Sequence, residues 1–212
     1  MALSKLAANS FDLTDNYALT GTVTGVTSTQ KLFLIKNIDA SSSSTVSFVD
    51  GASDVVLDNT YKTYLFKFIN IHRSVDGANF LFNGSTDGGS NYNVTKTTSY
   101  FGAVHREDDA SASLFYSTGN DLAQSTSFQN LGIGAGNDSD QSGVGEMWLF
   151  NPSSTTFVKH FMTNGNQSQS TPGSLNVRVA GYMNTTSAIN AIQFKPSSGN
   201  IDSGRIALYG IK

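Results

Sequence analysis

The sequence contains no cysteine, which excludes disulfides, thiolate metal sites and cysteine nucleophiles. Charged residues make up only 14% of the chain, against roughly 25% in ordinary soluble domains. Glu107 and Glu146 are the only glutamates, which leaves few candidates for the paired carboxylates of acid–base catalysis. No apolar run approaches the length of a membrane-spanning helix. Together these absences favour a protein that is not an enzyme and does not insert into a membrane.

Positive charge is also sparse. Thirteen Lys and Arg residues, scattered singly, face sixteen Asp and Glu, which gives a net charge of −3. Nucleic-acid binding requires a concentrated basic face that displaces counterions, so we expect no nucleic-acid partner. The first residues lack the apolar stretch of a secretory signal, which predicts synthesis in the cytoplasm.

Small polar and aromatic residues replace the missing charge. The chain has 29 Ser, 21 Thr and 19 Asn, about a third of its 212 residues, with 14 Phe, 8 Tyr and 20 Gly. This composition is typical of short strands joined by polar turns. Ala, Glu, Lys and Leu are too few for the faces of a helical bundle.

Alternating and β-branched segments predict a dozen strands. The expected strands cover residues 31–38, 45–49, 63–71, 79–82, 92–104, 112–116, 128–133, 144–150, 156–162, 175–182, 188–194 and 201–209. Clusters of Gly, Asn, Asp and Ser predict turns at 118–121, 134–140, 164–167 and 196–200. The only candidate helix is a single turn over residues 2–9. This spacing predicts an all-β fold, a jelly-roll-like β-sandwich.

Two segments resemble each other at an offset of 33 residues. Leu32, Phe33, Asn37 and Ile38 align with Leu65, Phe66, Asn70 and Ile71, and Asp50-Gly51 aligns with Asn83-Gly84 as a second predicted turn. The segments have strand character and no third copy follows, which argues against a helical repeat. We interpret them as two similar strand pairs, duplicated or convergent.

The first thirty residues differ from the rest, which divides the chain into residues 1–30 and a sandwich domain over 31–212. Large apolar side chains are few and irregularly spaced in the first segment. It is either a first strand or an attachment arm, and we favour the arm. Ordering it costs backbone entropy that docking of Phe11 and Tyr17 onto a neighbouring protein would offset.

Metal and catalytic motifs are weak. Asp138 and Asp140 match the first half of a calcium loop, but its twelfth position is Leu149 instead of a bidentate glutamate. We therefore favour a solvated turn and expect no metal or cofactor. His105-Arg-Glu107 would share one strand face, although neighbouring charges favour a solvated loop edge. No Gly-X-Ser-X-Gly elbow occurs, and we predict no enzymatic activity.

Aromatic residues offer another possibility. Seven of them could line a sugar-binding platform: Tyr61, Tyr64, Tyr92, Tyr100, Tyr116, Tyr182 and Trp148. At strand positions most aromatic side chains belong to the core or to cross-strand pairs, so we expect Trp148 in the core.

Several sequence segments resemble segments of virion structural proteins of tailed, marine podovirus-like bacteriophages. They cover residues 64–72, 76–80, 150–160, 180–195 and 198–210, and the segments 11–17 and 21–25 are similar to the N-termini of tail appendages. These segments have the composition of strands and turns and contain no catalytic motif. The resemblance implies a virion role on the capsid or the tail.

Composition and resemblance lead to one expectation. The chain is a non-enzymatic virion component, a capsid decoration or tail-appendage subunit that docks on other virion proteins, with a homotrimer favoured. The alternative is a carbohydrate-binding or receptor-binding module on a virion tip, with a host-surface glycan as its ligand.

Overall fold

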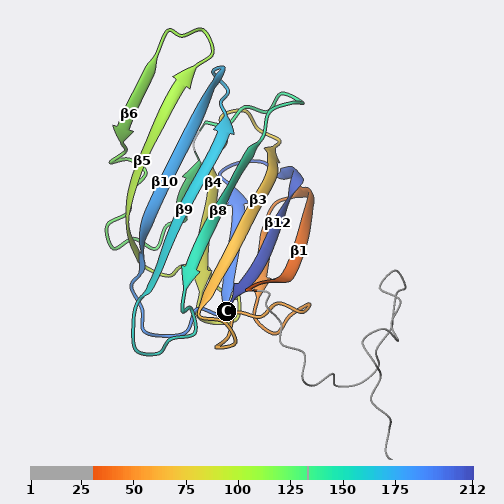
Figure 1. The fold of residues 1–212 in the computed structure, drawn as a ribbon, viewed down its shortest axis with the longest axis vertical. Coiled ribbons are helices and arrows are strands. Elements are labelled where there is room, and N and C mark those ends of the chain that lie inside the picture. Colours follow the sequence, from red (N-terminus) through yellow and green to blue (C-terminus); the bar gives the residue numbers. More distant parts are fainter. Residues whose placement is uncertain (1–30, 133) are drawn as a thin grey trace, which may run out of the picture. The chain divides into compact units, whose positions relative to one another are not determined.

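A computed structural model describes residues 31–132 and 134–212, whose strands form two antiparallel β-sheets. The large sheet lies in front in Figure 1, from β6 at the left to β1 at the right. Its eight strands, in spatial order, are β1 (Leu32–Ser43), β12 (Ile201–Ile211), β3 (Thr63–Arg73), β8 (Gly143–Phe150), β9 (Lys159–Ser168), β10 (Gly173–Met183), β5 (Lys96–Arg106) and β6 (Ala112–Tyr116).

The small sheet covers one face of the large one. Its four strands, in order, are β2 (Val46–Val49), β11 (Ala191–Pro196), β4 (Phe80–Ser85) and β7 (Gln129–Gly132). An all-β sandwich is therefore confirmed, whereas the finer jelly-roll description stays a prediction.

The two similar strand pairs occupy equivalent places. β1 and β3 flank β12 in the large sheet, while β2 and β4 flank β11 in the small sheet. Each pair thus crosses from the large sheet to the small one on either side of the pair β11–β12. The offset of 33 residues in the sequence reflects this shared position.

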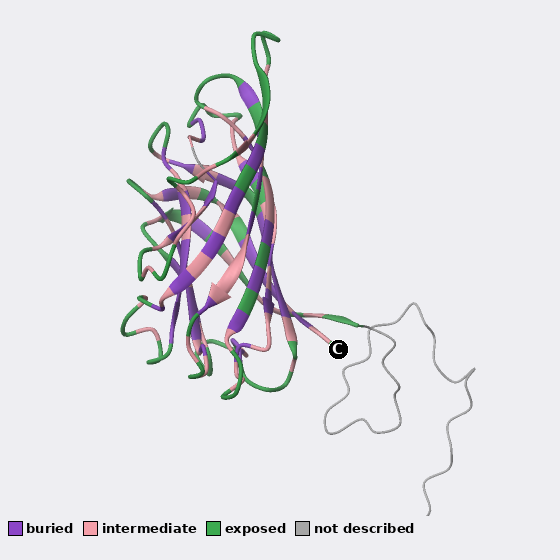
Figure 2. Cartoon of the chain, turned by 90° about the vertical axis from the view of Figure 1, so that its left-hand side faces the viewer, coloured by how far each residue is buried: buried purple, intermediate pink, exposed green. Residues whose placement is uncertain are grey.

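Buried and exposed residues alternate along strands of the large sheet, as the purple and green bands of Figure 2 show. In β8, for example, Met147 and Leu149 are fully buried, whereas Val144 is 47% exposed. Successive side chains of a strand point to opposite faces of its sheet. The large sheet therefore has an inner face toward the small sheet and an outer face that the described residues leave uncovered.

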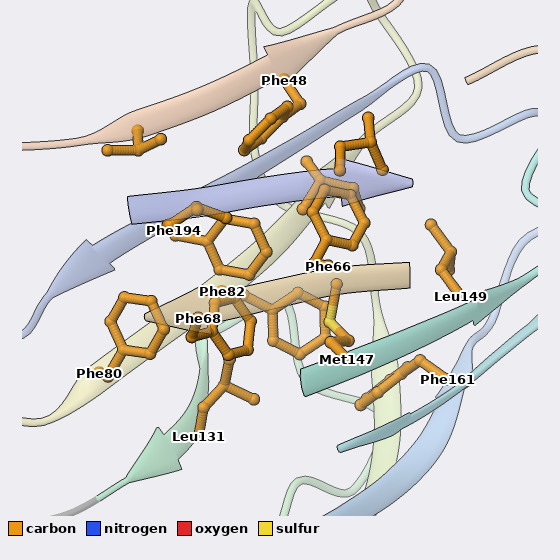
Figure 3. Packing of buried hydrophobic residues seen from close by; sticks show 14 of the residues in the cluster. Phe48, Phe66, Phe68, Phe80, Phe82, Leu131, Met147, Leu149, Phe161 and Phe194 are labelled. Carbon is orange, nitrogen blue, oxygen red and sulfur yellow. The ribbon is translucent and has the colours of Figure 1, made fainter. Parts of the chain in front are cut away.

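Phenylalanine rings join the two sheets. Phe194 of β11 lies at the centre of the group in Figure 3, and its ring centroid lies 5.1–6.3 Å from five other rings, those of Phe48, Phe66, Phe68, Phe80 and Phe82. Three of the five pairs are edge-to-face, an arrangement that aromatic quadrupoles favour. Because these rings come from four strands of both sheets, Phe194 couples the sheets to each other.

All twelve predicted strands occur, but two predicted turns are wrong. Residues 164–167 belong to β9, where they pair with β8 on one side and β10 on the other. Asn83-Gly84 lies inside β4, and a Cβ at Gly84 would lie 2.9 Å from the Sδ of Met183. Backbone pairing on both sides of residues 164–167 outweighs the turn preference of Asn and Gly there, whereas Asn83-Gly84 is held in β4 by pairing with β11 and by close packing. The candidate helix at 2–9 and the arm lie outside the described residues.

A polar cluster fixes the loop between β6 and β7. Asn83 donates from Nδ2 to the carbonyls of Tyr92 and Thr126, and its Oδ1 accepts from Lys96 Nζ at 2.6 Å. Lys96 is fully buried and also donates to the carbonyl of Val94. Burial lowers the pKa of Lys96 to about 7, because desolvation disfavours the charged amine.

We expect Phe194→Ala to lower the free energy of unfolding by about 3–5 kcal/mol, since it leaves a cavity at the centre of the aromatic group. Denaturant unfolding measures the change. Phe157→Ala is the matched control, because Phe157 is 69% exposed and its truncation should change stability by less than about 0.5 kcal/mol. Equal losses in both variants would contradict the central role of Phe194.

The buried Lys96 predicts an alkaline rise in stability. Between pH 7 and about 9.5 the unfolded chain holds a proton that folded Lys96 has lost, so the free energy of unfolding increases with pH, by at most about 1.4 kcal/mol per unit for this group. Lys159, whose pKa is also lowered by burial, acts in the same direction. Lys96→Met should reduce the slope, and Lys36→Met should not. A flat wild-type profile over this range would contradict the prediction.

Candidate functional site

The outer face of the large sheet carries an apolar row that crosses six strands. Its members oppose one another in consecutive register pairs, and we call this set the apolar row: Leu34, Tyr209, Leu65, Trp148, Met162 and Ala180. Leu34 and Met162 are more than half exposed. Leu65 is buried in the middle of the row, so the exposed side chains of Leu34 and Met162 are the ones that offer a contact surface for another molecule.

Trp148 was expected in the core, and that prediction is wrong. Its chain neighbours Met147 and Leu149 are buried between the sheets, so alternation places Trp148 on the outer face, where it is half-buried. Its indole Nε1 donates to Oε1 of Glu146 at 3.1 Å, which confirms that both side chains share this face. The sequence contained a signal for this, because residues 144–150 form a strand in which only one set of alternate side chains can point into the core.

A polar row runs beside the apolar row, two residues further along the same strands. It consists of opposed residues from four strands: Lys67, Glu146, Asn164 and Arg178. Lys67 Nζ lies 2.5 Å from Oε2 of Glu146. The hydrogen bond from Lys67 and then that from Trp148 lower the pKa of Glu146, which holds this carboxyl ionised at neutral pH.

Further aromatic side chains lie on the same face. The rings of His160 and Tyr182, opposed on β9 and β10, are 5.9 Å apart. Toward the β6 edge, Phe101 opposes Tyr116, and Leu114 is 80% exposed. The face therefore combines flat rings with amide, carboxylate and guanidinium groups. These groups can make stacking and hydrogen-bond contacts with an extended partner.

The other predicted platform residues do not gather there. Tyr64 and Tyr100 are fully buried, and Tyr61 packs against the core. Of the seven aromatic candidates, Trp148, Tyr116 and Tyr182 lie on the outer face. Tyr209, Met162 and Leu34 were missed, because only the register between distant strands aligns them with Trp148.

Asp138 and Asp140 lie in an exposed turn between β7 and β8. The backbone N–H of Gln141 donates to the carbonyl of Asp138, and Oε1 of Gln141 accepts from the N–H of Asp138. Within the described residues no group of three or more His, Asp or Glu side chains is arranged to hold a metal ion. His105 is exposed at the β5–β6 hairpin, where Nε2 lies 2.9 Å from Oδ1 of Asp109.

We expect EDTA to leave the melting temperature unchanged, since the Asp138 turn closes through Gln141 and needs no ion. Thermal unfolding with and without the chelator measures this. A drop of several degrees that calcium alone reverses would show that the loop binds metal.

Neither a protein-family model nor a curated protein nor a solved structure matches this chain. Among the described residues, no helix is long and apolar enough to cross a membrane. Phe11 and Tyr17, the predicted docking residues, lie outside the described residues.

Proposed function

We propose that this chain is a non-enzymatic structural component of a phage virion, a capsid decoration or tail-appendage subunit that docks on other virion proteins. The resemblance of residues 64–72 and 180–195 to such proteins supports the virion role. The apolar row is the observation that carries docking, because it exposes Leu34 and Met162 on a sheet face with six strands of matched register.

A homotrimer is the proposed assembly. A broad sheet face with apolar side chains can pack about a three-fold axis and repeat one contact three times. Repetition in a symmetric particle then raises the total affinity without a strong single contact. Synthesis in the cytoplasm of the bacterial host agrees with a chain that has no cysteine.

We expect Met162→Asp to convert the trimer into monomers, since it places a charge within the apolar row. Light scattering measures the mass, and circular dichroism verifies that the variant is folded. Phe157→Asp is the control: its side chain is 69% exposed in the β8–β9 loop, so the trimer should persist. A wild-type monomer in solution, together with isolated copies on the particle, would refute the trimer.

Immunogold labelling of the virion tests the location. Gold on the head or on the tail supports the proposal and decides between decoration and appendage, while unlabelled particles refute it.

Deletion of residues 2–28 tests the arm. Docking through Phe11 and Tyr17 predicts a soluble β domain that no longer joins the particle. Aggregation or a far lower melting temperature would instead assign the segment to the core.

Carbohydrate binding is the second candidate. It is favoured by the rings of Trp148, Tyr182 and Tyr209 on the same face as Asn164 and Arg178, since sugars stack on aromatic rings and hydrogen-bond to amide and guanidinium groups.

Trp148 is the only tryptophan, so its fluorescence reports on this face alone. If glycans bind there, compounds selected on a glycan array should change the emission of the isolated protein, and Trp148→Ala should abolish the binding. An array without hits would leave protein docking as the function of the face.

A further inference from the structure

The interior contains three buried cations and, among the described residues, no buried carboxylate. The buried polar and charged side chains are Arg73, Asn83, Ser85, Lys96, Thr98, Gln129, Lys159, Thr163 and Gln167. A buried charge without a partner costs several kcal/mol, so each cation needs a compensating group or must lose its proton.

The charge of each of the two lysines is compensated in one of these ways. Lys96 donates to two oxygens, and its lowered pKa lets it become neutral near pH 7. Lys159 donates to the carbonyl of Thr185 at 3.0 Å.

The charge of Arg73 is not compensated by a comparable set of partners or by loss of its proton. It is 1% exposed, and Nη2 donates to Oε1 of Gln167 at 3.1 Å, while Nε and Nη1 have no hydrogen-bond partner. Burial lowers the pKa of Arg73 to about 10, so the guanidinium stays charged at neutral pH.

A cavity of about 30 Å³ adjoins Arg73 between the two sheets. Gly165 and Gly143 line it from the large sheet and Gly132 from the small sheet, and the missing side chains leave the space open. Pairing between β3 and β8 is also irregular here, because the register shifts between Phe68 and Ile71. The volume equals about one water molecule's share of liquid, which is enough for a single monatomic ion.

Glu146 also lines the cavity, but its carboxylate is already engaged by Lys67 and Trp148. Val144, Glu146 and Asn164 line both this cavity and a shallow depression on the outer face. These shared residues place the cavity next to a surface from which a small solute can enter.

We propose that this cavity binds a chloride-sized inorganic anion on the guanidinium of Arg73. The anion supplies the missing negative charge and accepts hydrogen bonds from Nε and Nη1. Water could fill the same space and accept the same bonds, but it would leave the charge uncompensated. The inference is independent of the proposed function, since the site lies between the sheets and not in the apolar row.

Thermal unfolding at constant ionic strength tests the site, with chloride or bromide replacing gluconate, an anion too large for the cavity. Because the anion binds only the folded state, the wild-type melting temperature should rise by several degrees in halide. An equal melting temperature in halide and gluconate would overturn the proposal and indicate water only.

Arg73→Met should abolish the halide effect and, in gluconate, unfold at or above the wild-type temperature, because it removes an uncompensated buried charge. A merely structural arginine predicts a lower temperature in every salt. Arg178→Met, at an exposed arginine of the outer face, is the matched control and should keep the effect. Persistence of the effect in Arg73→Met would overturn the proposal.

Gly165→Ala offers a variant that retains Arg73. Its Cβ would lie 3.3 Å from the carbonyl oxygen of Val144 and 3.9 Å from that of Leu131, and would take up part of the cavity. We expect it to reduce the halide effect.

If these variants fail to fold, ³⁵Cl line broadening by the wild-type protein decides the question. Broadening that bromide reverses supports the site, and its absence overturns it.

Discussion

The contact between the two sheets through Phe194 is the constraint on which the rest of the structure depends. Phe194 comes from β11, which lies between β2 and β4 in the small sheet, and its ring reaches Phe66 and Phe68 on β3. Burial of these rings holds the small sheet against one face of the large sheet. The described residues do not cover the opposite face of the large sheet, and the apolar row lies on it.

The same packing explains why the interior has an apolar region and, away from it, regions with buried cations. Where the aromatic group is dense, the core is apolar and close-packed. Away from it, glycines on facing strands leave space beside Arg73, and Asn83 and Lys96 fill the region under the β6–β7 loop with hydrogen bonds. Buried cations are tolerated in both places because neutral oxygens, deprotonation or a bound anion can compensate them.

The apolar row and the polar row lie side by side on the outer face, and this arrangement supports the proposed docking over an extended surface. In the proposed docking the polar row would add specificity, because the Lys67–Glu146 pair and the Asn164 amide present fixed donors and acceptors. The neighbouring Trp148 and Met162 would supply apolar contact area in the proposed docking.

The existence of the strands could be predicted from the sequence, because alternation and β-branched or aromatic content are local properties. The local residue pattern of segments such as 63–71 and 144–150 predicts that they are strands. The offset of 33 residues already indicated two equivalent strand pairs. Only the tertiary structure decided that residues 164–167 and Asn83-Gly84 continue strands, and that Arg73 is buried beside a cavity. These features depend on pairing and packing between segments far apart in the chain, and hydrogen bonds from two neighbouring strands can outweigh the turn preference of any single residue.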